Sequence, residues 1–223
     1  SPDEPSAMPD TQKGALIIGI NEVDIGRYGS PMSALRTAER DALAMEESLR
    51  KHGFDTGDPL LGSMATLDAA LAQLQWSAQT YANPGDVFVL YFAGHGSQVP
   101  DPTWSERDGR NETFCLYDGE LIDHALYVAL AAFRPGVRVL VITDCCHSGA
   151  DELWNNPRVP SPLLGTARTL TREESDEAFR RLAVPCNVQP RLRPGERARI
   201  LSADVELIAA CRESELAFEG PTL

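Results

Sequence analysis

Short apolar runs alternate along the chain with longer segments in which apolar residues recur every three or four positions. Gly14–Ile20, Val87–Phe92 and Val137–Thr143 are continuous apolar runs, typical of strands buried on both faces. Ala34–His52 and Thr66–Tyr81 lie between these runs and show the helical period. The pattern predicts buried strands that alternate with amphipathic helices.

The remaining signals are weaker. Phe114–Tyr117 and Leu207–Cys211 are expected as short strands, and Leu121–Phe133 as a helix. Val99–Asn111 is polar, contains two prolines and is expected as a surface loop. The order strand-helix-strand-helix-strand predicts an α/β fold, with a mostly parallel central sheet and helices on both of its faces.

Composition narrows the class of protein. The 223 residues indicate one domain, or one domain with a long insertion, and 43% hydrophobic content suffices for a core. A net charge of −13 argues against nucleic-acid binding and suits a cationic substrate. No apolar run approaches the length of a membrane span, and residues 1–13 are polar, without the features of a signal peptide, and expected to be disordered.

The cysteines point to a reducing compartment. Five is an odd number, two of them are adjacent, and Cys211 lies in an apolar run, which does not suit a disulfide framework. We therefore expect a cytoplasmic location.

Residues 155–199 differ from the rest of the chain. They contain nine arginines against five acidic residues, a local balance of +4 on an acidic protein, together with six prolines. Arg172–Leu182 is the part of this stretch with a helical pattern. The composition predicts an exposed, flexible segment, for which a simple linker is the alternative interpretation.

Two strings combine an apolar run with reactive residues. YFAGHGSQ (Tyr91–Gln98) contains His95, and VITDCCHSGA (Val141–Ala150) contains Cys146, 51 residues later. Active sites of open α/β sheets form beyond the carboxyl ends of parallel strands. Both residues are therefore expected at one edge of one sheet.

These strings resemble the catalytic blocks of the caspase-like cysteine peptidases, and the DCCHSG form is most similar to the metacaspase and orthocaspase (prokaryotic caspase-like) branch. Leu35–Phe54 is similar to the first family helix, and Ala209–Glu219 to the start of the smaller C-terminal part. The resemblance implies a caspase-like fold: a catalytic large-subunit-like part at 14–154, a processing loop at 155–199 and the start of a small-subunit-like part at 200–223. Family members usually continue beyond this point, so the resemblance implies a truncated C-terminal part.

The resemblance also implies roles for individual residues. Cys146 would be the nucleophile and His95 the base and acid, since the thiolate is the attacking species and an imidazole favours it. The main-chain N–H groups of Gly96 and Cys146 would hold the oxyanion. Asp41 and Asp144 would line the primary pocket, where two carboxylates suit Arg and also Lys.

Neighbouring residues leave alternatives open. Cys145 is an alternative nucleophile and His147 an alternative base, although adjacent side chains point apart along an extended chain and Cys145 is expected to pack inward. A zinc site formed by His95, Cys145, Cys146 and His147 is another alternative, although adjacent ligands suit one tetrahedral ion poorly.

Many metacaspases bind Ca²⁺ through a cluster of acidic residues, and this sequence departs from that pattern. His124 follows Asp123 where the family has a pair of aspartates, and Leu153 stands where another aspartate is expected. Because Ca²⁺ needs several hard oxygen ligands, we expect no metal site, no cofactor and no calcium dependence.

We interpret the chain as a cysteine endopeptidase that cleaves proteins after exposed Arg, and also Lys, through a Cys/His dyad. A catalytically silent interaction or scaffold module of the same fold is the alternative, and a Cys145–Cys146 acyl transferase or redox protein is a third. Expected partners are protein substrates and an upstream activating protease, with no nucleic acid and no membrane. The residues 155–199 would be cleaved by the enzyme itself or by that protease. The candidate processing sites are Arg158, Arg168, Arg172, Arg180, Arg181, Arg191, Arg193, Arg197 and Arg199.

Overall fold

The strands form two sheets in the computed structural model, which describes residues 10–29, 32–101, 109–145, 168–193 and 196–209. The larger sheet is parallel throughout, in the order β2-β1-β3-β7-β8. Its members are β1 (Lys13–Gly19), β2 (Leu60–Leu61), β3 (Val87–Ala93), β7 (Arg138–Asp144) and β8 (Asp204–Ala209). The smaller, antiparallel sheet consists of β4 (Gly96–Pro100), β5 (Arg110–Cys115) and β6 (Glu120–Ile122). The predicted parallel central sheet is confirmed.

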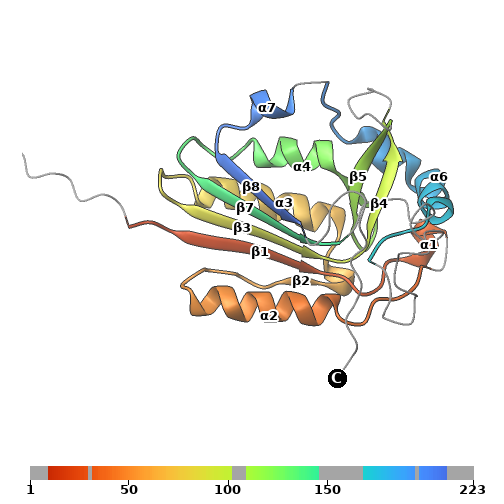
Figure 1. Ribbon diagram of the computed structural model, residues 1–223, viewed down its shortest axis with the longest axis horizontal. Coiled ribbons are helices and arrows are strands. Elements are labelled where there is room, and N and C mark those ends of the chain that lie inside the picture. Colours follow the sequence, from red (N-terminus) through yellow and green to blue (C-terminus); the bar gives the residue numbers. More distant parts are fainter. Residues whose placement is uncertain (1–9, 30–31, 102–108, 146–167, 194–195, 210–223) are drawn as a thin grey trace, which may run out of the picture.

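Helices cover both faces of the parallel sheet (Figure 1). Helix α2 (Ala38–Lys51) packs on one face, and α3 (Leu67–Thr80) and α4 (Asp123–Leu130) pack on the other. Successive residues of β1 belong to two different hydrophobic clusters, because side chains of a strand point alternately to opposite faces. This two-sided burial explains why the strands are continuous apolar runs in the sequence.

Local signals set the ends of helices α2 and α3. Thr66 caps α3 by accepting a hydrogen bond from the N–H of Ala69, as its position predicts. Gly53 follows α2 with φ +81°, a left-handed conformation that glycine adopts without strain. Gly19 lets α2 approach β1 closely, since a Cβ there would lie 2.6 Å from the Cβ of Ala42. This contact fixes the N-terminal half of α2 beside the end of β1.

Several sequence-based boundaries were wrong, and three of them concern strands that the sequence did not predict in place. The segment predicted as the loop 99–111 contributes to strands at both of its ends, and Val99 is fully buried in β4. Leu121 belongs to β6, and α4 begins two residues later, at Asp123. The last strand begins at Asp204 rather than Leu207. In each case strand pairing, a long-range interaction, determines the boundary.

A smaller group of elements lies beside the antiparallel sheet (Figure 1). It contains α1 (Ile25–Tyr28) and α6 (Arg172–Val188). Two short elements lie elsewhere: α7 (Arg197–Ile200) precedes β8, and a 3-10 turn, η1 (Gly62–Met64), follows β2. Helix α6 is longer than the predicted 172–182 and begins with a capping box, in which Thr171 and Glu174 each bind the other's backbone N–H. Most of the described residues between 155 and 199 are thus helical.

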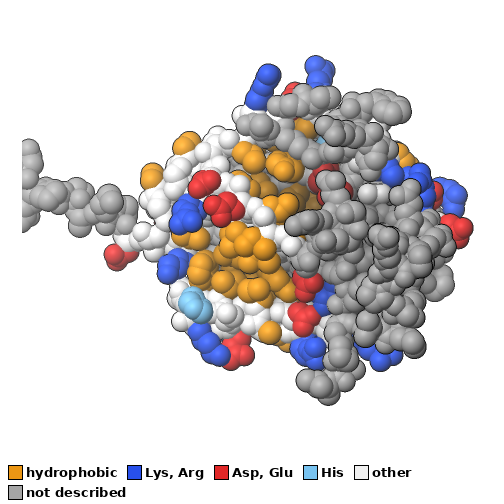
Figure 2. All heavy atoms as spheres, in the orientation of Figure 1, with side chains coloured by type: hydrophobic (Ala, Val, Ile, Leu, Met, Phe, Trp, Pro, Cys, Tyr) orange, Lys and Arg blue, Asp and Glu red, His pale blue; other side chains and the backbone are white. Residues whose placement is uncertain are grey.

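Strand β8 is an edge of the parallel sheet, and its Leu207 and Ile208 are exposed. Figure 2 shows hydrophobic side chains gathered on the face of the molecule on which Figure 1 draws β8. No helix in the described parts of the chain is long and apolar enough to cross a bilayer.

Candidate active site

Strands β3 and β7 are neighbours and end at the same edge of the sheet. Ala93, the last residue of β3, is paired with Asp144, the last residue of β7. His95 lies two residues beyond β3, and Cys145 directly follows β7. The described parts of the two sequence blocks therefore end at one edge of the sheet, whereas Cys146 and His147 lie outside the described residues.

His95 is buried, at 4% exposure, between β3 and β4. Its ring Nε2 lies 2.8 Å from the carbonyl oxygen of Ser33, and its own carbonyl accepts the N–H of Cys115. A carbonyl oxygen can only accept a hydrogen bond, so Nε2 carries a proton. In the neutral form of the ring, the lone pair then lies on Nδ1.

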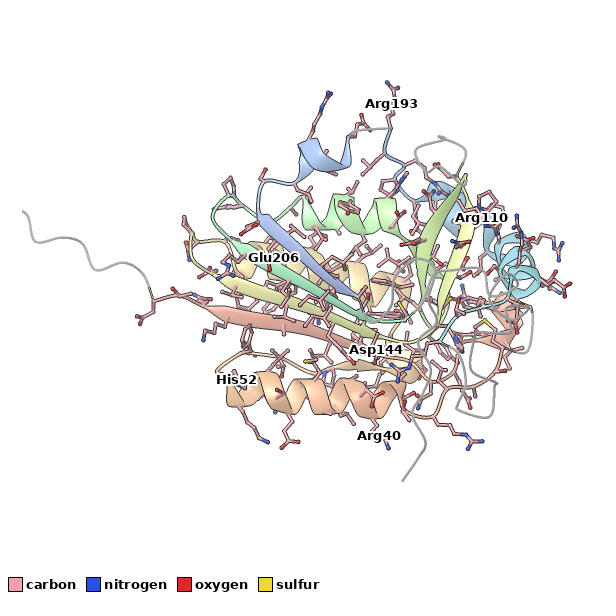
Figure 3. All side chains as sticks on the ribbon, in the orientation of Figure 1. Arg40, His52, Arg110, Asp144, Arg193 and Glu206 are labelled. Atoms are coloured by element: carbon pink, nitrogen blue, oxygen red, sulfur yellow. The ribbon has the colours of Figure 1, made fainter. Side chains whose placement is uncertain are left out.

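The two predicted pocket carboxylates lie close together, although 103 positions separate them in the sequence. Asp41 lies in the first turn of α2. Asp144, which Figure 3 labels, ends β7. Both form ion pairs with the guanidinium of Arg168, which is 2% exposed. The guanidinium also donates to Thr37 Oγ1 at 2.7 Å and to the carbonyl of Asp144 at 3.2 Å. An arginine of the chain itself therefore occupies the acidic pocket.

The electrostatics of the pocket favour a cation. Burial opposes the charge of Arg168, but Asp144 and Asp41 outweigh this effect and raise the pKa of its guanidinium. Burial, and then the charge of Asp144, raise the pKa of Tyr91, whose hydroxyl lies 3.5 Å from Asp144 Oδ2. Tyr91 therefore stays neutral and adds a hydrogen-bond donor, not a third negative charge, to the pocket.

The backbone of Arg168 is held as tightly as its side chain. The N–H of Gly96 donates to the Arg168 carbonyl at 3.0 Å, and the N–H of Leu170 donates to the Gly96 carbonyl at 3.0 Å. Gly96 and Thr169 form a parallel bridge. The Arg168 carbonyl thus binds the Gly96 N–H group, which the family resemblance implies as a donor to the oxyanion.

The other candidate processing sites lie elsewhere, as far as the structure describes them. Arg172, Arg180 and Arg181 belong to helix α6, where the latter two pair with Glu177. Arg193 lies well away from Asp144 in Figure 3. Arg191 donates to the carbonyl oxygen of Cys186. Arg197 and Arg199 belong to α7, and Arg158 lies outside the described residues.

The structure describes the environments of Cys145 and His124, which belong to the alternative nucleophile and to the calcium question. Cys145 is 1% exposed, as expected for a side chain that packs inward. His124 is fully buried, and its Nδ1 accepts the N–H of Leu192 at 3.0 Å. In the described ranges, no three His, Cys, Asp or Glu side chains are placed to hold a metal ion. Leu153 lies outside those ranges, so calcium independence stays a prediction.

Sequence reasoning missed three contributors to the site. Thr37 was detectable, because it stands one helical turn before Asp41 at the start of α2. Tyr91 was detectable in principle, since it precedes His95 on a predicted strand. Ser33 contributes a backbone carbonyl, for which no residue type gives a signal.

Comparison with known proteins places this geometry in a family. The family model described as the caspase domain matches residues 12–223. Metacaspase-1B of Aspergillus fumigatus is 32% identical over 154 residues, covering 62% of this chain and 36% of the relative. Metacaspase-1 of Mycosarcoma maydis is 25% identical, covering 95% of this chain and 58% of the relative. The chain thus spans between about a third and three fifths of these two relatives.

A solved structure shows the same arrangement. The crystal structure of a Geobacter sulfurreducens protein superposes with a TM-score of 0.76 at 32% identity, covering 93% of this chain and 78% of that one. The matched family model, the metacaspase relatives and the shared architecture agree with the resemblance stated from the two sequence blocks. The chain belongs to the caspase-domain family, and the two curated relatives compared above are metacaspases.

Proposed function

We propose that this protein is a cysteine endopeptidase that cleaves after Arg, and less efficiently after Lys. One observation supports this specificity above all: Arg168 has its guanidinium between Asp41 and Asp144 while its carbonyl accepts the Gly96 N–H. A substrate peptide needs both contacts at once, one for recognition and one for stabilisation of the oxyanion.

Cys146 is the proposed nucleophile. His95 takes the thiol proton through Nδ1, since Nε2 faces the Ser33 carbonyl. The thiolate attacks the arginyl carbonyl carbon, and the oxygen gains charge beside the N–H groups of Gly96 and Cys146. The carbon–nitrogen bond then breaks, His95 gives its proton to the leaving amine, and water hydrolyses the thioester.

Specificity follows from the pocket donors and acceptors. The planar guanidinium can bind two carboxylates and the Thr37 hydroxyl at once. The ammonium group of lysine is a point charge on a flexible chain and does not match this planar arrangement. A substrate aspartate would add a third negative charge. We therefore expect Arg to be preferred over Lys, and Asp to be refused.

Among the nine candidate processing sites, we propose the bond between Arg168 and Thr169 as the one the enzyme cuts in itself. The arginines of α6 would first have to leave their helix, because peptidases take substrates as extended chains. Until it is cut, the segment competes with substrates for the pocket.

A panel of fluorogenic peptides ending in Arg, Lys or Asp tests the specificity, with Cys146→Ala as the inactive control. Asp144→Asn and Asp41→Asn should each lower kcat/KM for the Arg peptide by roughly tenfold or more, since each removes one charge partner. Cleavage after Asp would overturn the pocket argument. Failure to cleave any peptide would favour the silent scaffold module.

Mass spectrometry of the incubated protein tests the self-cleavage. Fragments should end at Arg168 and begin at Thr169, and Cys146→Ala should remain whole. If wild type also remains whole until another protease is added, an upstream protease makes the cut.

A further inference from the structure

The residues that follow Arg168 are anchored independently of it. Leu170 is 1% exposed and belongs to the main hydrophobic cluster, and its N–H binds the carbonyl of Gly96. Thr169 is 7% exposed and pairs with Gly96 as in a parallel strand. Two residues beyond the proposed scissile bond are thus fixed to the same glycine that binds the Arg168 carbonyl.

Helix α6 extends this anchor. Ser175 Oγ lies 3.0 Å from Ser97 Oγ, and Asp176 forms an ion pair with Arg110 at 2.8 Å. Both contacts join α6 to the antiparallel sheet, where Figure 3 labels Arg110. At the far end of the helix, Gln189 donates to the carbonyl of Glu120 at 2.6 Å.

The inner face of α6 is apolar. It buries Ala178, Leu182 and Cys186 in the main cluster. All of these contacts lie on the C-terminal side of the Arg168–Thr169 bond, so hydrolysis of that bond removes none of them.

We propose that, after self-cleavage, the new α-amine of Thr169 stays at the active site and accepts acyl groups, so that the cleaved protein joins an Arg-ending peptide to Thr169. This inference rests on the proposed function, because it requires an acyl-enzyme. The activity is transpeptidation at a site whose acceptor amine belongs to the protein itself.

The chemistry balances without a further reactant. A donor peptide ester ending in Arg acylates the Cys146 thiolate, and its alcohol leaves with a proton from His95. The neutral amine of Thr169 then attacks the thioester carbonyl, a carbon–nitrogen bond forms, and the thiolate leaves. His95 receives the proton lost by the amine.

Proximity decides between the amine and water. An oriented intramolecular nucleophile can reach an effective concentration of about 10⁵ M or more, well above the concentration of water. An α-amino group has a pKa of about 7.7–8.0, so a large share of it is neutral near pH 8. Ligation should therefore compete with hydrolysis and increase with pH across this range.

The test uses self-cleaved protein and a fluorescent peptide ester ending in Arg. We expect label on the fragment that begins at Thr169, and tandem mass spectrometry should locate the donor acyl group on the Thr169 amine. Cys146→Ala should acquire no label. Arg168→Glu, which should not be cut at this position, should also acquire none, because its Thr169 nitrogen remains in an amide.

Leu170→Ala tests the anchor. A misplacement of about 1 Å can cost about a hundredfold in rate, so the yield of labelled fragment should fall about tenfold or more while the donor is still hydrolysed. Asp176→Asn is a milder variant, which loosens α6 without opening a core cavity, and should give a smaller fall.

Two negative results have different meanings. If self-cleaved wild type hydrolyses the donor and no adduct forms at Thr169, the ligation proposal is overturned and the peptidase proposal stands. If the protein neither cuts itself nor consumes the donor, the proposed function itself fails.

Discussion

Replacement of Arg168 is the most direct test of how the acidic pocket recognises its ligand. Each charge-assisted hydrogen bond contributes about 1.5–3 kcal/mol, so the two carboxylate contacts of Arg168 are worth roughly 3–6 kcal/mol before solvent is considered. The side chains of Asp41 and Asp144 are each 31% exposed, and water replaces part of what they lose. About 2–3 kcal/mol then remains.

The expected rates follow from this remaining free energy. Leu170 and α6 hold the segment even without the arginine side chain. Arg168→Gln should therefore slow self-cleavage by about 10- to 100-fold, rather than by the whole factor that corresponds to the lost contacts. Arg168→Lys keeps the charge but loses the planar fork, and should slow the reaction by about three- to tenfold. Arg168→Glu should not be cut at this position.

The assay is a time course of the intact chain and its two fragments by mass spectrometry, at constant salt. Arg193→Gln is the matched control, since this arginine is exposed and distant from Asp144 (Figure 3), and it should behave as wild type. The reasoning is refuted if Arg168→Gln is cut at the same bond at the wild-type rate, or if Arg193→Gln slows the reaction equally.

Three further predictions concern other parts of the molecule. Cys146→Ala should abolish hydrolysis of the Arg peptide while Cys145→Ala, at a buried position, keeps most of it; equal losses in two folded variants would contradict the assignment. Burial raises the pKa of Glu120 to about 6 from its ordinary value of 4.5, so its proton stabilises the fold fully below about pH 4.5, and this stabilisation, about 2 kcal/mol, is lost as pH rises through 6. Urea unfolding of wild type and Glu120→Gln from pH 4 to 8 should show this slope in wild type only, and parallel curves would refute it. Hydrolysis of the Arg peptide should persist in EGTA, since His124 is engaged with Leu192, and a reversible calcium requirement would show that other oxygens form a site.

The hydrophobic pattern by itself determined the larger part of the fold. Strands buried on both faces must be continuous apolar runs, and β1, β3 and β7 are found where these runs lie. The ends of such strands determine where reactive residues gather, so the shared sheet edge that carries His95 and Asp144 followed from sequence. The antiparallel sheet did not, because Val99 and Arg110 lie in short, mixed segments whose pairing depends on the rest of the core.

Only the tertiary structure decided which arginine occupies the pocket. Nine arginines of the 155–199 segment had equal claims by composition, and local sequence ranks none above the others. Arg168 reaches Asp41 across 127 residues because Leu170 is buried in the core and α6 docks on the antiparallel sheet. The same packing brings in Thr37, and the carbonyl of Ser33 reaches His95 through the course of the backbone. Residue types encode local periodicity, whereas these contacts depend on how distant elements pack, which a single sequence does not display.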